Sequence, residues 1–262
     1  MRRREFITLV GGAAAAWPLG ARAQQPAPMR RVSLLLGIAE NDPEARSRVK
    51  AFQQGLRDLG WLEGRNIRID YRFSDGDPNR IKEHVAELVR LAPDVIVGNS
   101  TPVIAALQQA TSTIPIVFAV VNDPVGQGFI SSLARPAGNI TGFTFVEFAM
   151  IGKWGGMLRD VSPDLSRAAL MFNPDTAPYY VGYLRSFERM PWSIPVDVSA
   201  TPVRDVAEIE ELISKLGREP GSGLIAPPDP FIIVQRDAIL RSAKKHRVPA
   251  VYAYRQFVLK AV

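Results

Sequence analysis

Short apolar runs alternate along the chain with longer segments in which apolar residues recur at about every third or fourth position. The first run, "RVSLLLG", is continuous and ends in Gly37, as expected of a strand buried on both faces of a parallel sheet. The segment 41–60 is predicted to be helical, because Asp42-Pro43 suits an N-cap and first turn and Gly60 ends the pattern. A buried strand followed by a helix is thus the first structural unit.

The same strand and helix pattern repeats to the end of the chain. The strand 66–73 alternates apolar and polar residues, which predicts a place near one side of its sheet. The alternation of strands and helices predicts an α/β fold of parallel sheets with helices on both faces and right-handed connections. A second series begins after Phe145, so we expect an N-terminal lobe at 30–144 and a C-terminal lobe at 145–262. The other helices are predicted at 78–91, 102–110, 125–133, 147–159, 179–190, 203–216 and 231–245, and the other strands at 94–99, 115–120, 139–145, 167–173, 194–200, 223–228 and 249–254.

The first residues have the anatomy of a cleavable export signal. A basic start precedes a modest apolar stretch and the small-x-small pattern Ala21-Arg22-Ala23, which predicts a signal peptide at 1–23. A membrane anchor is the alternative, but the apolar stretch is short and contains glycines and a proline, whereas a spanning helix needs roughly 20 apolar residues. The pair Arg3-Arg4 resembles a twin-arginine signal.

Composition narrows the class of protein further. A chain of 262 residues with 47% hydrophobic residues can bury a real core, and it contains no cysteine. Disulfides, thiolate metal sites and a lipid-bearing cysteine are therefore excluded, and we expect a soluble protein of the periplasm without a lipid anchor. The formal charge of +6 falls to +3 without the charges of residues 1–23, which is too mild an excess to indicate nucleic-acid binding.

Polar residues directly follow several of the apolar runs. In open parallel sheets, ligands bind beyond the carboxyl ends of the strands, so these loops are where the sequence predicts a site. The candidate ligand-binding residues are Asn41, Ser100, Thr101, Asn122, Asp123, Asp229 and Tyr254.

Two interpretations of these residues stay open at the level of sequence. Ser100 and Thr101 begin a helix, where free backbone N–H groups suit a carboxylate or phosphate, but they are also ordinary N-cap residues. Asp123 and Asp229 also suit a helix start or a turn. Lodged in a cleft, each carboxylate would instead require a cation, such as a ligand ammonium or an arginine.

Catalytic motifs are scarce. The chain has no GxxxxGK[ST] phosphate loop, no GxSxG elbow and no HExxH helix, and neither His84 nor His246 lies in a strand-end loop. We therefore expect no metal, no cofactor and no enzymatic activity. The alternative from another class is an exported α/β enzyme that uses Asp123 as acid or base.

Four stretches together resemble a known family: the signal "MRRREFITLVGGAAAAWPLGARAQQ", "FQQGLRDLGWLEGRNIRIDYRFSDGDPNRIKEHVAELVRLAPDVIV", "IPIVFAVVNDPVGQGFISSLARPAGNITGFT" and "VPAVYAYRQF". The chain is similar over its whole length to ABC-transporter substrate-binding proteins of the tryptophan/tyrosine type. The resemblance implies the type I periplasmic-binding fold, with two Rossmann-like lobes that close over a small ligand, an amino acid or similar compound.

The resemblance also implies a partner, a permease in the inner membrane, and a monomeric binding protein. It assigns ligand contacts to Ser100, Thr101, Asn122, Asp123 and Asp229, and places Tyr254 near the crossing between the lobes.

Family members continue beyond the "YRQF" stretch with segments that return to the first lobe, whereas this chain ends at "QFVLKAV". We therefore expect a C-terminally truncated protein whose first lobe is incomplete. The alternative that follows is a nonfunctional fragment of a binding protein.

Overall fold

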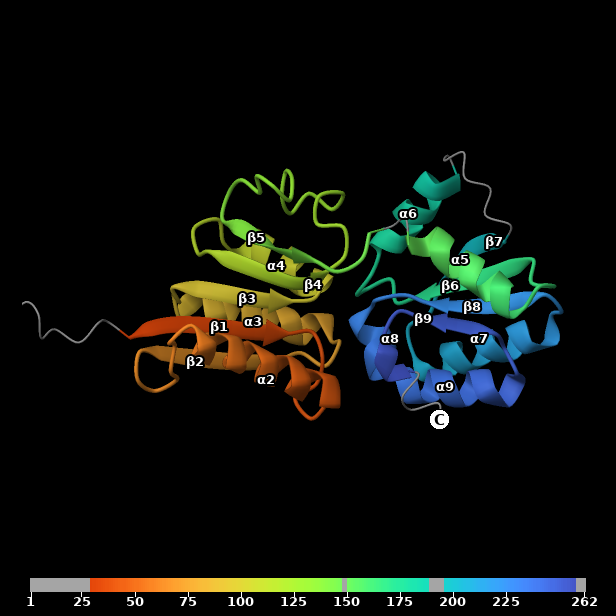
Figure 1. Cartoon of the computed structure of the whole chain (residues 1–262), viewed down its shortest axis with the longest axis horizontal. Helices are drawn as coiled ribbons and strands as arrows, with labels where there is room; N and C mark the ends of the chain where they lie inside the picture. The colour runs from red at the N-terminus through yellow and green to blue at the C-terminus, as the bar shows by residue number, and fades with distance from the viewer. Residues whose placement is uncertain (1–28, 148–149, 189–195, 258–262) are drawn as a thin grey trace, which may run out of the picture.

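A computed structural model describes residues 29–147, 150–188 and 196–257, which form two α/β lobes side by side (Figure 1). The predicted export signal at 1–23 lies outside the described residues. Each lobe is one parallel sheet with helices on both faces, which confirms the predicted fold class. None of the helices in the described part of the chain is long and apolar enough to cross a membrane.

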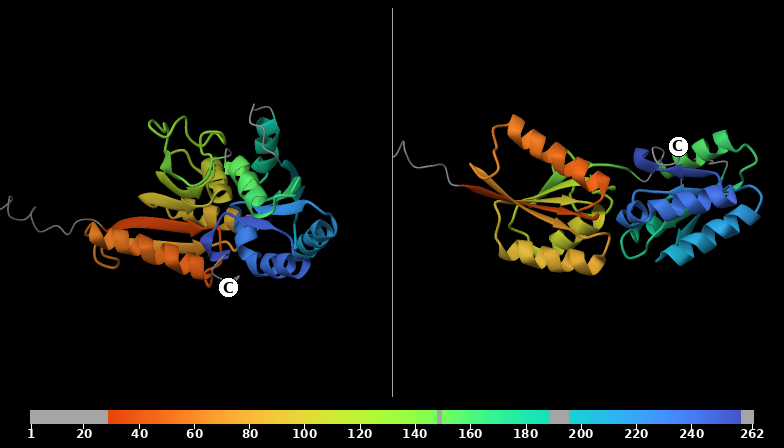
Figure 2. Two further views of the ribbon diagram at one scale, coloured as in Figure 1. Left: turned by 45° about the vertical axis from the view of Figure 1, so that its right-hand side comes forward. Right: turned by 90° about the horizontal axis from the view of Figure 1, so that it is seen from below.

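The first lobe is built on a sheet of five strands in the order β2-β1-β3-β4-β5. In the right-hand view of Figure 2, one face of this sheet carries α2 and the other carries α3. The alternating strand 66–73 is β2 at the edge of the sheet, as predicted. The elements are β1 (Arg30–Leu36), α2 (Pro43–Asp58), β2 (Ile67–Phe73), α3 (Pro78–Arg90), β3 (Val95–Asn99), α4 (Thr101–Ala110), β4 (Ile116–Val121) and β5 (Ile140–Thr144).

The second lobe is built on a sheet of four strands in the order β7-β6-β8-β9. One face packs against α5 and α6, and the other packs against α7 and α9. The elements are α5 (Met150–Val161), β6 (Arg167–Phe172), α6 (Tyr179–Glu188), β7 (Asp197–Pro202), α7 (Val206–Arg218), β8 (Ser222–Ala226), α8 (Pro230–Val234), α9 (Arg236–His246) and β9 (Ala250–Tyr252).

Aspartates begin four of the helices. The side chains of Asp42, Asp77, Asp205 and Asp229 each accept a hydrogen bond from a backbone N–H of the first turn, and a proline follows three of the four. A carboxylate there satisfies a free donor and lies at the positive end of the helix dipole. Three Asp-Pro pairs therefore mark helix starts, and capping of α8 is one role of Asp229.

The predicted helix at 125–133 is wrong. Asp123 instead bends the chain into turns: its Oδ1 accepts from the Gly126 N–H at 3.0 Å and its carbonyl oxygen accepts from the Gln127 N–H at 3.0 Å. Gly128 follows with a positive φ of 74°, which a continuing helix does not allow.

The predicted helix at 231–245 is two helices. Gln235 leaves helical geometry, with φ −89° and ψ 11°, so that α8 ends there and α9 begins at Arg236. Because of this break, Arg236 lies in the first turn of α9, where its side chain pairs with Asp42 of the first lobe.

The buried core runs across the boundary between the lobes. One cluster joins residues of β1 and β2 in the first lobe, such as Leu36 and Ile69, to Met171, Ile239 and Tyr254 in the second. The two lobes are therefore packed against each other in this structure.

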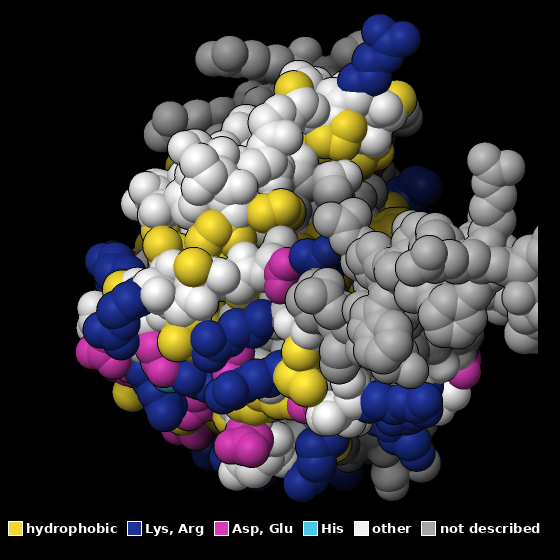
Figure 3. Space-filling model, turned by 90° about the vertical axis from the view of Figure 1, so that its left-hand side faces the viewer, with side chains coloured by type: hydrophobic (Ala, Val, Ile, Leu, Met, Phe, Trp, Pro, Cys, Tyr) yellow, Lys and Arg dark blue, Asp and Glu magenta, His cyan; other side chains and the backbone are white. Residues whose placement is uncertain are grey.

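Charged residues of both signs mix on the far end of the first lobe, seen in Figure 3. At the amino ends of its strands, Arg30 pairs with Asp94 at 2.7 Å and Arg31 pairs with Asp70 at 2.6 Å.

Candidate functional site

The carboxyl ends of the two sheets meet where the lobes touch. Asn122 follows β4 and is buried, with 4% of its surface exposed. Its side-chain nitrogen donates to the Pro228 carbonyl oxygen at 3.0 Å and to the Tyr179 hydroxyl at 3.1 Å, both in the second lobe. Its Oδ1 is buried and has no hydrogen-bond partner among the described residues, which is unusual for a buried polar atom. The predicted residue Asn122 is therefore a direct link between the lobes.

A pocket of about 250 Å³ opens beside this contact, between the lobes. Its walls in the first lobe come from α3, from α4 along most of its length and from Gln127, and its walls in the second lobe come from the segment 175–179. The first lobe supplies an apolar surface, and Tyr179 supplies an aromatic ring. The lining includes Ile81, Lys82, Thr101, Pro102, Gln127, Asp175 and Tyr179.

Two opposite charges border this pocket from opposite lobes. Lys82 lies on α3 and Asp175 lies in the loop after β6. Both residues are exposed, and within the described residues neither takes part in an ion pair. The sequence prediction missed both, although Asp175 lies in a strand-end loop and could have been found by that signal.

Ser100 lies at the N-cap of α4, but its side chain makes no cap hydrogen bond. Its φ of 116° is rare outside glycine, and its buried Oγ has no hydrogen-bond partner in the part of the chain that the structure describes. Gly37 is adjacent, since a Cβ built there would lie 2.5 Å from Ser100 Oγ. Ser100 is therefore not an ordinary cap residue.

Thr101 joins the ends of two elements. Its Oγ1 accepts from the Asn122 N–H at 3.1 Å, which ties the start of α4 to the end of β4. Thr101 also borders the pocket, so it positions Asn122 and contributes to the wall.

Asp123 is half-buried, and its side chain makes a hydrogen bond within its own loop. Its Oδ1 accepts from the Gly126 N–H, and a Cβ built on Gly126 would lie 2.0 Å from Asp123 Oδ2. Its backbone N–H donates to the Val146 carbonyl oxygen at 3.0 Å, so it also anchors the segment between the lobes. The structure places Asp123 as a turn residue that is not part of the pocket lining.

Asp229 is completely buried and organises the second-lobe wall. Its Oδ1 accepts from Thr176 Oγ1 at 2.6 Å and from the Phe231 N–H at 2.9 Å, and its Oδ2 accepts from the Asn173 N–H at 2.8 Å. Burial raises the pKa of this carboxyl to about 6, although the three hydrogen bonds oppose the shift. Asp229 thus holds the loop that carries Asp175.

Tyr254 is buried at the boundary between the lobes. Its ring stacks on Phe145, with centroids 5.3 Å apart, and lies 6.0 Å from the guanidinium carbon of Arg48. Burial raises the pKa of the Tyr254 hydroxyl well above its usual range, and the Arg48 charge opposes that shift. Arg48 in turn donates to Asn99 Oδ1 at 2.8 Å and pairs with Glu44 at 2.8 Å. Arg48 is a third residue that the sequence analysis missed, because nothing in the local sequence of α2 distinguishes it.

Asn41 lies away from the pocket between the lobes. It is exposed and borders a separate hollow of about 790 Å³ on the first lobe, with Arg46, Arg72 and His84. Of the seven predicted residues, Thr101 lines the pocket between the lobes, whereas Asn41 lines this separate hollow.

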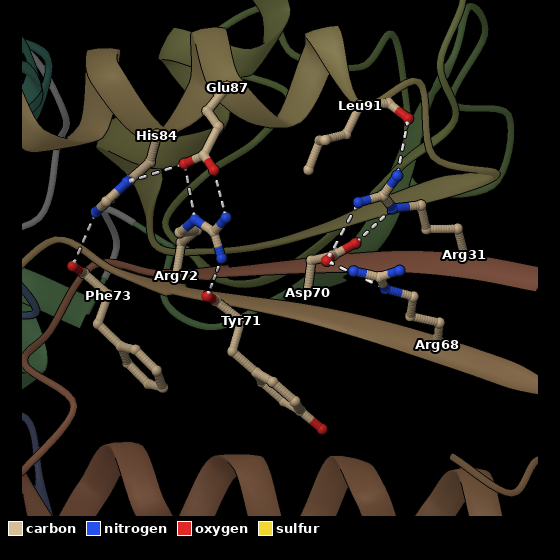
Figure 4. A network of polar contacts seen from close by, with 9 residues as sticks. All are labelled: Arg31, Arg68, Asp70, Tyr71, Arg72, Phe73, His84, Glu87 and Leu91. Atoms are coloured by element: carbon tan, nitrogen blue, oxygen red, sulfur yellow. Dashed lines mark hydrogen bonds and ion pairs between the residues drawn. The ribbon is translucent and has the colours of Figure 1, made fainter. Parts of the chain in front are cut away.

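A polar network behind this hollow fixes β2 to α3 (Figure 4). Arg72 pairs with Glu87 through two hydrogen bonds, and His84 Nε2 lies 3.2 Å from the Phe73 carbonyl oxygen. The Arg72 guanidinium holds the pKa of the Glu87 carboxyl below its usual value. Among the described residues, no group of three His, Cys, Asp or Glu side chains could hold a metal ion.

Comparison with known proteins identifies the class. The family model of ABC transporter substrate binding proteins matches residues 38–261. A curated relative, the tyrosine-binding protein of Clostridioides difficile strain R20291, is 24% identical over 220 residues, which cover 82% of this chain and 62% of the relative. This chain therefore spans less than two thirds of that relative's length.

Solved structures share the fold. The ABC domain from Streptococcus pneumonia in complex with L-Trp superposes with a TM-score of 0.76 at 20% identity, over 88% of this chain and 76% of that one. A conserved domain protein from Vibrio cholerae gives a TM-score of 0.77 at 23% identity, with the same two coverages. With its two parallel α/β lobes and a family match over residues 38–261, the chain belongs to the ABC transporter substrate binding proteins, with the type I periplasmic-binding fold.

Proposed function

We propose that this protein is the solute-binding component of an ABC uptake transporter and that its ligand is an amino acid bound in the pocket between the lobes. The observation that carries the proposal is the pair of opposite charges, Lys82 and Asp175, that border this pocket from opposite lobes. An amino acid is a zwitterion, so it would offer a carboxylate to one lobe and an ammonium to the other.

The proposed pose follows from the pocket walls. The ligand carboxylate lies near Lys82 and the first turn of α4 at Thr101, where free N–H groups favour an anion. The α-ammonium lies near Asp175, and the ligand side chain packs between Tyr179 and the apolar surface at Ile81. This pose keeps the predicted carboxylate position but replaces Asp123 and Asp229 as partners of the ammonium.

Size and relatives support a small, aromatic ligand. The pocket volume of about 250 Å³ lies below the usual range of roughly 300–1,000 Å³ for drug-sized ligands. The Clostridioides difficile relative is named a tyrosine-binding protein, and the Streptococcus structure contains L-Trp. We therefore infer an aromatic amino acid.

The mechanism is closure of two lobes around the ligand. A ligand that touches both lobes favours the closed form by its differential affinity for it. The protein would be exported by the signal at 1–23, act as a soluble monomer in the periplasm without a lipid anchor, and deliver its ligand to a permease in the inner membrane. It performs no chemistry on the ligand.

Calorimetric titration of the amino-acid-depleted protein with the L-amino acids tests this proposal. We expect binding of tryptophan or tyrosine. The variants Lys82→Met and Asp175→Asn each lose a charge-assisted contact, so affinity falls about tenfold to a hundredfold. Lys50→Met on α2 and Asp160→Asn on α5 remove an exposed charge of the same sign from the same lobe, away from the pocket, and leave affinity unchanged. If the wild-type protein binds none of the amino acids, the proposal fails.

A further inference from the structure

A buried ion pair joins the two lobes on the side of α2. Arg236 Nη1 lies 2.5 Å from Asp42 Oδ2, and the two side chains are only 10% and 7% exposed. These residues are 194 positions apart in the chain. The pocket between the lobes is bordered instead by α3 and α4, on the opposite face of the first sheet, so the pair is separate from the proposed site.

Both oxygens of Asp42 have a defined partner. Oδ1 accepts a hydrogen bond from the Glu44 N–H at 2.8 Å and caps α2, while Oδ2 accepts one from Arg236 Nη1. The same Arg236 nitrogen also donates to the Ile233 carbonyl oxygen at 2.8 Å. Each side chain of the ion pair is therefore also held in place by a hydrogen bond within its own lobe.

The start of α9 does not favour a positive charge at the position of Arg236. Arg236 is the first residue of this helix, where the helix dipole disfavours a cation. The break at Gln235 brings it there, and Asp42 on the other lobe supplies the compensating charge. The neighbouring surface is close-packed, since a Cβ built on Gly76 would lie 3.6 Å from Val234 Cγ2 of α8.

We propose that Asp42 and Arg236 form a closure latch, a pair of positioning residues that sets how much of the protein is closed before any ligand binds. Separated lobes would expose both charges to water, whereas the closed form buries them and tolerates this because they are paired. Removing one partner leaves the other buried and unpaired in the closed form alone. Each single neutral variant therefore shifts the protein toward the open form.

The consequence for binding rests on the function proposed above. Only the closed form presents both walls of the pocket, so the observed affinity is the intrinsic affinity reduced by the closed fraction. The latch would thus set ligand affinity without touching the ligand.

The distance between the lobes can be measured directly in ligand-free full-length protein. Because the sequence has no cysteine, Lys50→Cys on α2 and Lys244→Cys on α9 provide two specific labelling positions for single-molecule energy transfer. In this background we compare Asp42→Asn, which keeps an N-cap side chain but removes the charge, with Arg236→Met and with both together. Arg236→Lys retains the cation if the methionine variant does not fold.

We expect each single neutral variant to lower the ratio of closed to open molecules about tenfold or more, and the double variant to recover part of the loss. Asp77→Asn is the matched control, because Asp77 caps α3 through Asn79 and Arg80 within the first lobe. Its ratio should equal that of the wild type.

Unchanged ratios in Asp42→Asn and Arg236→Met would overturn the latch. So would a double variant that is as open as the two single effects combined, since the residues would then act independently. The readout needs no ligand, so failure of tryptophan to bind would contradict the proposed function and leave the latch to be judged on the distances alone.

Discussion

The side-chain nitrogen of Asn122 lies 3.0 Å from the carbonyl oxygen of Pro228 on the other lobe. With the second hydrogen bond to the Tyr179 hydroxyl, one buried amide supports both sides of the pocket between the lobes. The contact between the lobes and the shape of the pocket are therefore linked through this residue.

Asn122→Ala removes both interlobe hydrogen bonds, each worth about 1 kcal/mol. We expect tryptophan affinity to fall about tenfold or more in a calorimetric titration. Asn139→Ala is the control, because the Asn139 amide also donates to two carbonyl oxygens, those of Thr111 and Ile114, entirely within the first lobe. That variant should lose stability and retain affinity; equal losses of affinity in both would contradict the assignment.

Asp229 should make the folded protein less stable as the pH rises from about 4 to 6. Its pKa is raised to about 6 in the folded state, so the folded state retains a proton that the unfolded chain releases near pH 4. This contribution to the free energy of unfolding is fully present below pH 4. It decreases by up to about 3 kcal/mol as the pH rises through 6.

Urea unfolding of wild type and Asp229→Asn at intervals from pH 4 to 7 measures this difference. Asparagine does not titrate, so the free-energy difference between the two proteins should change across that range. A difference that stays constant with pH would show that Asp229 titrates at its ordinary pKa.

Gly37 and Ser100 should be coupled. Gly37→Ala places a methyl group 2.5 Å from Ser100 Oγ, so we expect a loss of about 1–3 kcal/mol in unfolding free energy. Ser100→Gly removes that clash and suits the φ of 116°. The double variant should therefore be more stable than Gly37→Ala alone, as measured by urea unfolding, and simple additivity of the two changes would contradict the contact.

Asp70 should have the opposite pH signature to Asp229. A hydrogen bond from Arg31 lowers its pKa, so its stabilisation is present above the unfolded pKa near 4 and is lost as the pH falls below it. The pair is partly open to solvent, so the contribution is about 1 kcal/mol or less (Figure 4). Asp70→Asn should therefore lower stability at pH 7 but hardly at all at pH 2 to 3, as followed by urea unfolding. A loss of equal size at both pH values would indicate a cause other than charge.

The sequence predicted the fold well because its signals are local. Continuous apolar runs located the strands, and Asp-Pro pairs located helix starts at Pro43, Pro78 and Pro230. The failures have local causes too: Asp123 and the glycines after it form turns where a helix was predicted, and Gln235 divides a pattern that is apolar enough for one helix.

The site was predicted less completely, because it depends on contacts between distant residues. Asn122 and Thr101 were found from their places after strands, and the structure brings them together. Lys82 and Arg48 acquire their significance only when the lobes meet, and nothing in their local sequence marks them. Asp175 has a local signal, its place in the loop after β6, but its opposite charge lies on the other lobe.

The two oxygens of Asp42 make the Glu44 amide a reporter of the proposed separation of the lobes. One oxygen accepts from the Glu44 amide and the other from the opposite lobe, so separation of the lobes frees the carboxylate to rotate away from the helix start. Hydrogen exchange at the Glu44 amide should therefore quicken whenever the molecule opens. A single backbone proton would then record opening and closing in unlabelled protein.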